Sequence, residues 1–179
     1  MVAPKHQSLF DVLMIYAAVP RGKFIMKSIL QYAPIIGQFG LRIGCIPVNR
    51  GKRGQAIRKM LADVEAGRAR PGQLIIYPQG TRVAPEAQVP YKVGSFVLYN
   101  ELKQPCIPAA ANVGVFWPRH GITRKPGLAE FEFLDPIPPG LGQKHFMGQL
   151  EDVFEAHSDA LMVEAGFDVH AIRGEDRRA

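Results

Sequence analysis

The chain has 179 residues, 47% of them apolar, which is enough for one globular domain with a hydrophobic core and too few for several. Its formal net charge of +6 favours anionic partners, namely phosphate-bearing metabolites, an anionic lipid surface or nucleic acid. Nucleic acid is the least favoured of the three, because the sequence has neither zinc-finger spacing nor an aromatic RNA-binding motif.

The first predicted element is a helix over residues 9–20, where apolar residues recur at helical spacing and Asp11 suits the positive end of the helix dipole. A short strand over residues 23–27 is expected next. Residues 28–44 have a helical pattern that a proline breaks and a glycine ends. A second short strand is expected over residues 45–48.

The central part of the chain continues this alternation. A basic loop leads into a predicted helix over residues 55–67, and residues 73–78 have the pattern of a buried strand that ends at a proline. Residues 83–93 are rich in proline and alanine and predict a loop. The next helix is predicted over residues 94–103.

The last third of the chain begins with a short apolar strand over residues 105–113, which fits an interior position in a parallel sheet. Apolar and polar residues alternate over 129–137, which predicts a half-exposed strand. Residues 141–166 predict a long amphipathic helix, and the charged tail of residues 173–179 is expected to be disordered.

Strands that alternate with helices, without a repeat or a long linker, indicate one α/β domain with a mixed, mostly parallel sheet flanked by helices. We expect this domain to cover residues 1–172. Cys45 and Cys106 each lie in an apolar run and are expected to be buried, reduced thiols.

A histidine and an aspartate, His6 and Asp11, stand five residues apart near the start of the chain. On one helix they would lie about 140° apart, so they meet only if His6 precedes the helix and folds back over its first turn. The carboxylate then accepts the proton of one ring nitrogen and leaves the other as a general base. The alternative is a histidine that lies by chance near a helix-capping aspartate.

Two arginines follow strand ends, where open α/β sheets place their ligands. Residues 75–82 run from an apolar strand into Gly80, Thr81 and Arg82, which together offer flexible backbone, a hydroxyl and a guanidinium for a phosphate. Arg50 ends a similar run after the strand over 45–48. The alternative in both places is a turn with a solvated surface arginine.

Four segments, in this order, resemble the motifs of the glycerolipid acyltransferases, most closely those of the 1-acylglycerol-3-phosphate acyltransferases. KHQSLFD resembles the first motif, Asn-His-x4-Asp, and GCIPVNR resembles the second, an apolar run that ends in arginine. YPQGTR is similar to the third, Phe-Pro-Glu-Gly-Thr-Arg, and CIPAAAN to the fourth, an apolar run around a proline. The resemblance covers residues 3–140.

This resemblance implies the glycerol-3-phosphate acyltransferase-like fold and transfer of a fatty acyl group from acyl-CoA or acyl-carrier protein to the sn-2 hydroxyl of 1-acylglycerol-3-phosphate. His6 is then the base and Asp11 the residue that holds its ring. Phosphate binding is implied for Arg50, Thr81 and Arg82, and oxyanion stabilisation or acceptor positioning for Gly80 and Gln79. No cofactor and no metal are implied. The partners implied are a lysophospholipid, the acyl donor and a membrane surface, without nucleic acid.

The sequence departs from the family pattern at three positions in these motifs, and the mildest departure is Tyr77 in place of Phe. Lys5 replaces the usual Asn, outside the base–carboxylate pair. Gln79 stands where the family has Glu, which keeps size and hydrogen-bonding capacity but loses the charge. Two alternatives therefore stay open, an acyltransferase for another lysolipid, such as lyso-ornithine lipid, and an inactive module that binds anionic lipid.

The N-terminus and one apolar segment bear on the cellular location. Relatives have a strand and usually a hydrophobic membrane-associating segment before the first motif, so we expect an N-terminally truncated protein whose sheet lacks a strand beside His6. Residues 29–44 suit either the core or an interfacial segment at an anionic bilayer, with Lys23, Lys27 and Arg42 nearby. The expected location is the cytoplasmic face of the inner membrane, either peripheral or anchored by a missing segment.

Overall fold

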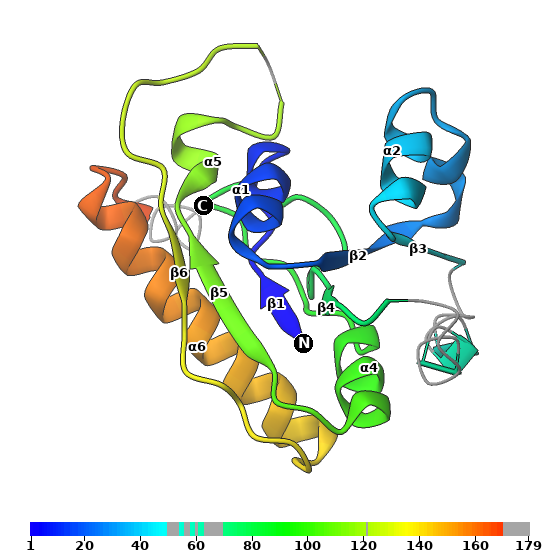
Figure 1. Ribbon diagram of the computed structural model, residues 1–179. Coiled ribbons are helices and arrows are strands. Elements are labelled where there is room, and N and C mark those ends of the chain that lie inside the picture. The colour runs from blue at the N-terminus through cyan, green and yellow to red at the C-terminus, as the bar shows by residue number, and fades with distance from the viewer. Residues whose placement is uncertain (50–53, 56–57, 60, 63–69, 121, 170–179) are drawn as a thin grey trace.

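The computed structural model in Figure 1 describes residues 1–49, 54–55, 58–59, 61–62, 70–120 and 122–169. Its strands are β1 (Val2–Pro4), β2 (Gly22–Lys27), β3 (Ile46–Val48), β4 (Gln73–Ile75), β5 (Ile107–Ala111) and β6 (Phe131–Phe133). Its helices are α1 (Phe10–Ala18), the 3-10 helix η1 (Ser28–Tyr32), α2 (Ile36–Arg42), α4 (Gly94–Leu102), α5 (Val113–Phe116) and α6 (Gln143–Glu164).

The six strands form one sheet in the order β3-β2-β4-β1-β5-β6. The pairs within β3-β2-β4-β1-β5 are parallel, and β6 alone pairs antiparallel, with β5. The predicted α/β domain with a mostly parallel sheet is confirmed. Because five strands are parallel, their carboxyl ends share one edge of the sheet, and the turn that carries His6 leaves β1 at this edge.

The expectation that the sheet lacks a strand beside His6 is wrong. Residues Val2–Pro4 form β1, which lies between β4 and β5 and is fully buried. The amino group of Met1 donates a hydrogen bond to the carbonyl oxygen of Pro105 at 2.8 Å, which ties the start of the strand to the segment before β5. A three-residue strand that contains a proline carries almost no sequence signal.

Alternate residues of the central strands build a core on each face of the sheet. Val2 and Ile75 pack with Ile15 of α1 on one face. Ala3 and Leu74 pack on the other face, against α4 and α6, in a cluster that includes the fully buried Phe146, Leu150 and Phe154 of α6. The predicted amphipathic helix over 141–166 therefore provides much of the core.

The remaining predicted elements were mostly confirmed, with shorter bounds. The helix expected over residues 28–44 is broken at the proline as predicted, into η1 and α2, and Gly44 ends it with a φ of +84°. The strands expected over 73–78 and 129–137 have only three residues each, and α5 was not predicted. Most of the helix expected over 55–67 and the tail of 173–179 lie outside the described residues.

A buried ion pair fastens the residue before His6 to α6. The side chain of Lys5 is 1% exposed, and its Nζ atom lies 2.9 Å from Oε2 of Glu155. The hydroxyl of Tyr91 donates to Oε1 of the same carboxylate at 2.7 Å. Burial, followed in size by the Glu155 carboxylate, raises the pKa of Tyr91 above its usual value, so the phenol stays protonated and keeps donating.

We predict that Glu155→Ala lowers the free energy of unfolding by about 3–5 kcal/mol, because it leaves the ammonium of Lys5 buried without its carboxylate. Urea unfolding measures the loss. The control is Glu132→Ala, which removes the contact between Glu132 and His157. Because these two side chains are 46% and 47% exposed, the variant should lower the free energy of unfolding by less than about 1 kcal/mol. Equal losses in the two variants would contradict the prediction.

Candidate active site

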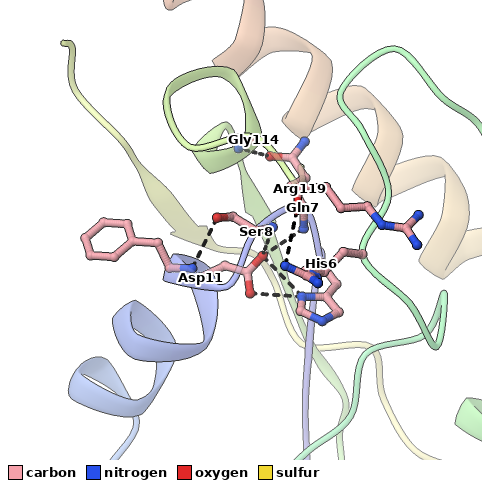
Figure 2. A network of polar contacts seen from close by, with 8 residues as sticks. His6, Gln7, Ser8, Asp11, Gly114 and Arg119 are labelled. Atoms are coloured by element: carbon pink, nitrogen blue, oxygen red, sulfur yellow. Dashed lines mark hydrogen bonds and ion pairs between the residues drawn. The ribbon is translucent and has the colours of Figure 1, made fainter. Parts of the chain in front are cut away.

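The turn between β1 and α1 brings His6 and Asp11 together (Figure 2). His6 lies on the loop after β1, and Asp11 is the second residue of α1, so the ring folds back over the first helical turn. The Nδ1 atom of His6 is 3.0 Å from Oδ1 and 3.3 Å from Oδ2 of Asp11. The two side chains meet in the way that their spacing required.

The Asp11 carboxylate is fully buried and is held by the backbone around it. Its Oδ2 atom accepts hydrogen bonds from the N–H groups of Gln7 and Ser8, each at 2.7 Å. The Oγ atom of Ser8 accepts a hydrogen bond from the N–H of Phe10 at 3.1 Å. These two short amide hydrogen bonds fix the orientation of the carboxylate at the start of the helix.

The Asp11 carboxylate determines which nitrogen of His6 carries the proton. An ionised carboxylate only accepts, so Nδ1 must donate and Nε2 keeps its lone pair. The His6 side chain is 17% exposed, which leaves it accessible to a substrate while its partner is buried. This geometry brings together the two groups that a general base with an orienting carboxylate requires, and their catalytic roles stay a prediction.

Tyr77 supports the His6 ring from β4's side of the turn, and sequence reasoning did not include it in the site. The two rings are stacked, with centroids 4.0 Å apart and planes 23° apart. Burial, and next the nearby Asp11 carboxylate, raise the pKa of Tyr77 far above its usual value, so the phenol is neutral. The available signal was its place in the third motif, where the family has another aromatic residue.

Gln7 fastens the turn to α5 and was also missed. Its Oε1 atom accepts a hydrogen bond from the N–H of Gly114 at 2.9 Å, as Figure 2 shows. A Cβ atom on Gly114 would lie 2.9 Å from the Cβ of Gln7, so only glycine lets the two segments approach this closely. Nothing in the sequence near Gln7 indicates this contact with a residue 107 positions away.

The loop after β4 runs beside the turn that carries His6. The N–H of Val83 donates to the carbonyl oxygen of His6 at 2.7 Å, which places the neighbouring Arg82 close to the turn. The half-buried Arg82 donates from Nη1 to the carbonyl oxygen of Arg119 at 3.4 Å. Thr81 is exposed, and Arg50 lies outside the described residues.

The role of Gly80 in oxyanion stabilisation or acceptor positioning stays a prediction, and its own N–H is engaged within the loop. That N–H donates to the carbonyl oxygen of Tyr77 at 3.0 Å, inside the turn. Gly80 has a φ of +69°, in the left-handed region that favours glycine. Its contribution is the shape of the loop that carries Thr81 and Arg82.

The role of Gln79 in acceptor positioning also stays a prediction, and the structure shows its side chain turned away from solvent. The residue is only 2% exposed, and neither Oε1 nor Nε2 has a hydrogen-bond partner among the described residues. The position in the third motif fixed its place along the chain but not the direction of its side chain. A buried, unpaired amide costs stability and makes no contact with solvent.

Two clefts lie near this region. The larger, about 530 Å³, lies between the loop at residues 88–93 and α6. The smaller, about 170 Å³, lies beside the start of α1, where Phe10 stacks on Trp117 with ring centroids 5.1 Å apart. The guanidinium carbon of Arg124 lies 4.0 Å from the centre of the Trp117 ring. This small cleft therefore has an aromatic wall with a cation beside it.

Comparisons with known proteins give a consistent result. The family model described as Acyltransferase matches residues 1–112. The chain is 26% identical over 172 residues to a putative 1-acyl-sn-glycerol-3-phosphate acyltransferase, acl-1, of Caenorhabditis elegans, covering 92% of this chain and 64% of that protein. It is 28% identical over 137 residues to the 1-acyl-sn-glycerol-3-phosphate acyltransferase of Saccharomyces cerevisiae, covering 74% of this chain and 45% of that protein.

The fold is similar to the crystal structure of the 1-acyl-sn-glycerophosphate (LPA) acyltransferase, PlsC, of Thermotoga maritima. The TM-score is 0.70 at 21% sequence identity, with 89% of this chain and 65% of that chain covered. The chain thus spans between about half and two thirds of the length of the proteins that it matches.

We predict that Gln79→Met raises the free energy of unfolding by about 1–2 kcal/mol, because a side chain of similar volume replaces an unpaired buried amide. Urea unfolding is the measurement. Gln149→Met, at an exposed position of α6, is the control and should change stability by less than about 0.5 kcal/mol. A loss of stability in Gln79→Met would show that the amide has a partner.

Proposed function

The chain belongs to the acyltransferase family, and from that premise we propose that it moves a fatty acyl group to the sn-2 hydroxyl of 1-acylglycerol-3-phosphate, which gives phosphatidate. The donor is acyl-CoA or acyl-carrier protein, whose thiol is released. The observation that carries the proposal is the 3.0 Å contact between Nδ1 of His6 and the buried Asp11 carboxylate. The names of the relatives support 1-acylglycerol-3-phosphate as the acceptor.

In the proposed reaction His6 activates the acceptor itself. Nε2 of His6 takes the proton of the sn-2 hydroxyl as its oxygen attacks the thioester carbonyl. The tetrahedral intermediate collapses, the carbon–sulfur bond breaks, and the imidazolium returns the proton to the departing thiolate. Asp11 stabilises the imidazolium between these steps, and the Gln7 and Ser8 amides hold its carboxylate in place. No acyl-enzyme forms, because the acceptor is the nucleophile.

The acceptor's phosphate is assigned to the cationic loop after β4. Arg82 offers a guanidinium, and the Thr81 hydroxyl is exposed beside it. The hydrogen bond between Val83 and the His6 carbonyl keeps this loop next to the base. Arg50 is proposed as a second phosphate ligand on the strength of its motif alone, because it lies outside the described residues.

The proposed location of the protein is a membrane surface, at the cytoplasmic face of the inner membrane, because lysophosphatidate and phosphatidate reside in bilayers. Of the helices that the structure describes, none is both long enough and apolar enough to cross a bilayer. No cofactor is assigned to the reaction, since the thioester of the donor supplies the activated acyl group.

We predict that His6→Ala lowers kcat by a factor of about 10²–10⁴ and leaves the KM for the acceptor nearly unchanged, because the proton acceptor is lost and the phosphate ligands are kept. Thiol release is measured with a panel of lysolipids and both donor types. His145→Ala, at an exposed position of α6, is the matched control and should retain activity.

The same assay contains the outcomes that contradict the proposal. A folded wild-type protein that releases no thiol with any lysophospholipid would exclude the enzyme and favour an anionic-lipid-binding module. Faster turnover of lyso-ornithine lipid, which has no phosphate, would move the acceptor to another lysolipid. If the His6→Ala variant bound the acceptor much more weakly but kept most of its kcat, His6 would be a ligand of the acceptor and not the base.

A further inference from the structure

The segment that contains η1 and α2 exposes large apolar side chains. We call residues Ser28–Ile43 the η1–α2 surface. Its most exposed apolar residues are Ile29 at 68%, Tyr32 at 76%, Ile35 at 71%, Phe39 at 58% and Leu41 at 47%. Single exposed apolar residues are ordinary in soluble proteins, whereas several within one short segment mark an interaction site. Of the two earlier interpretations of this segment, core packing is therefore wrong for these side chains.

Among the residues of α2 whose burial the structure describes, the buried ones are glycines. Gly37 and Gly40 are buried, whereas Phe39 and Leu41 face outward. A Cβ atom on Gly37 would lie 2.3 Å from the carbonyl oxygen of Gln31, so α2 lies directly against the backbone of η1. A surface helix of a soluble domain normally buries its large apolar residues and exposes polar ones. This helix exposes Phe39 and Leu41 beside its polar residues, which suits an apolar partner on its outer face.

The sequence on both sides of the η1–α2 surface carries only positive charges. Residues 12–62 contain no Asp and no Glu but hold nine of the chain's 22 lysines and arginines. Lys27 and Arg42, at the two ends of the segment, are both exposed. Apolar side chains with a cationic border suit a surface that is apolar beneath a layer of negative charge, which describes an anionic lipid bilayer. A second copy of the same basic surface would instead be repelled.

The η1–α2 surface lies at the same edge of the sheet as His6. Parallel strands β1 and β2 lead into the turn that carries His6 and into η1 respectively, and Figure 1 shows α2 past the end of β2. A row of aromatic rings connects the exposed Tyr16 of α1 to the site. The ring centroids of Tyr16 and Phe24 are 6.3 Å apart, and so are those of Phe24 and Tyr77. The ring of Tyr77 stacks on that of His6 with centroids 4.0 Å apart.

We propose that the η1–α2 surface docks the protein onto an anionic lipid bilayer, with its apolar side chains among the acyl chains and its cations at the headgroups. This docking turns the His6 edge of the sheet toward the lipid. The inference deepens the proposed function, since a bilayer-resident acceptor then reaches Nε2 without leaving the interface. Docking itself requires no catalysis, so it can be tested separately.

The test is sedimentation with vesicles of phosphatidylcholine alone or with 30% phosphatidylglycerol, without any acyl donor. The wild-type chain should bind the anionic vesicles and lose most of this binding at high salt. Ile29→Asp/Phe39→Asp should weaken the partition coefficient at least tenfold. The control is Val97→Asp on α4, where Val97 is 40% exposed, and it should bind like the wild type. Circular dichroism checks that each variant is folded.

Three results would overturn the proposal. The first is that the wild-type chain does not bind vesicles, and the second is that the double variant binds them as well as the wild type does. The third is that the wild-type chain is a dimer in solution, whereas the double variant is a monomer that still binds vesicles. If the double variant does not fold, Phe39→Trp decides, because doxyl-labelled lipids should quench its fluorescence beyond that of the parent, whose one tryptophan is Trp117. Absence of that extra quenching would also overturn it.

A failure of docking and a failure of the proposed function give different results. If docking alone fails, the wild-type chain still releases thiol with a detergent-dispersed lysolipid but does not sediment with vesicles. If the activity alone fails, the chain sediments with anionic vesicles but releases no thiol. When both hold, the double variant keeps its rate on the dispersed acceptor and loses at least tenfold on acceptor in vesicles.

Discussion

The site depends on the hydrogen bonds that the buried carboxylate of Asp11 accepts. It accepts hydrogen bonds from the amides of Gln7 and Ser8 and from the His6 ring, and the residue has no exposed surface. Burying a carboxylate without such donors would greatly lower the stability of the fold, and the backbone of this turn supplies two of the donors. The contacts that fold this turn are therefore the same contacts that fix the tautomer of His6.

The sheet places this turn where a ligand can reach it. β1 is the central support, held by β4 and β5, and it ends directly before the buried Lys5 and the half-buried His6. Glu155 of α6 forms an ion pair with Lys5, and the N–H of Val83 in the loop after β4 donates a hydrogen bond to the His6 carbonyl. The neighbouring parallel strand, β2, leads to the η1–α2 surface at the same edge, which joins the chemistry to the lipid interface that we propose.

Local patterns in the sequence were sufficient for the order of the elements and for the pair at the centre of the site. The spacing of His6 and Asp11 allowed only one geometry, and that geometry is present. The strand β1 was missed because it has three residues. Tyr77 and Gln7 were missed because ring stacking and a bond to Gly114 depend on tertiary contacts. Motif position likewise could not show that the side chain of Gln79 turns inward or that the N–H of Gly80 is occupied by its own turn.

The central claim is that Asp11 keeps the proton on Nδ1 of His6 and leaves Nε2 as the base. Two-bond ¹H–¹⁵N correlation spectra of the imidazole, assigned to His6 with a His6→Gln variant, report this directly at a pH where the ring is neutral. The account predicts a protonated Nδ1 and an unprotonated Nε2, with the preference lost in Asp11→Asn. A protonated Nε2, or an unchanged spectrum in Asp11→Asn, would contradict it.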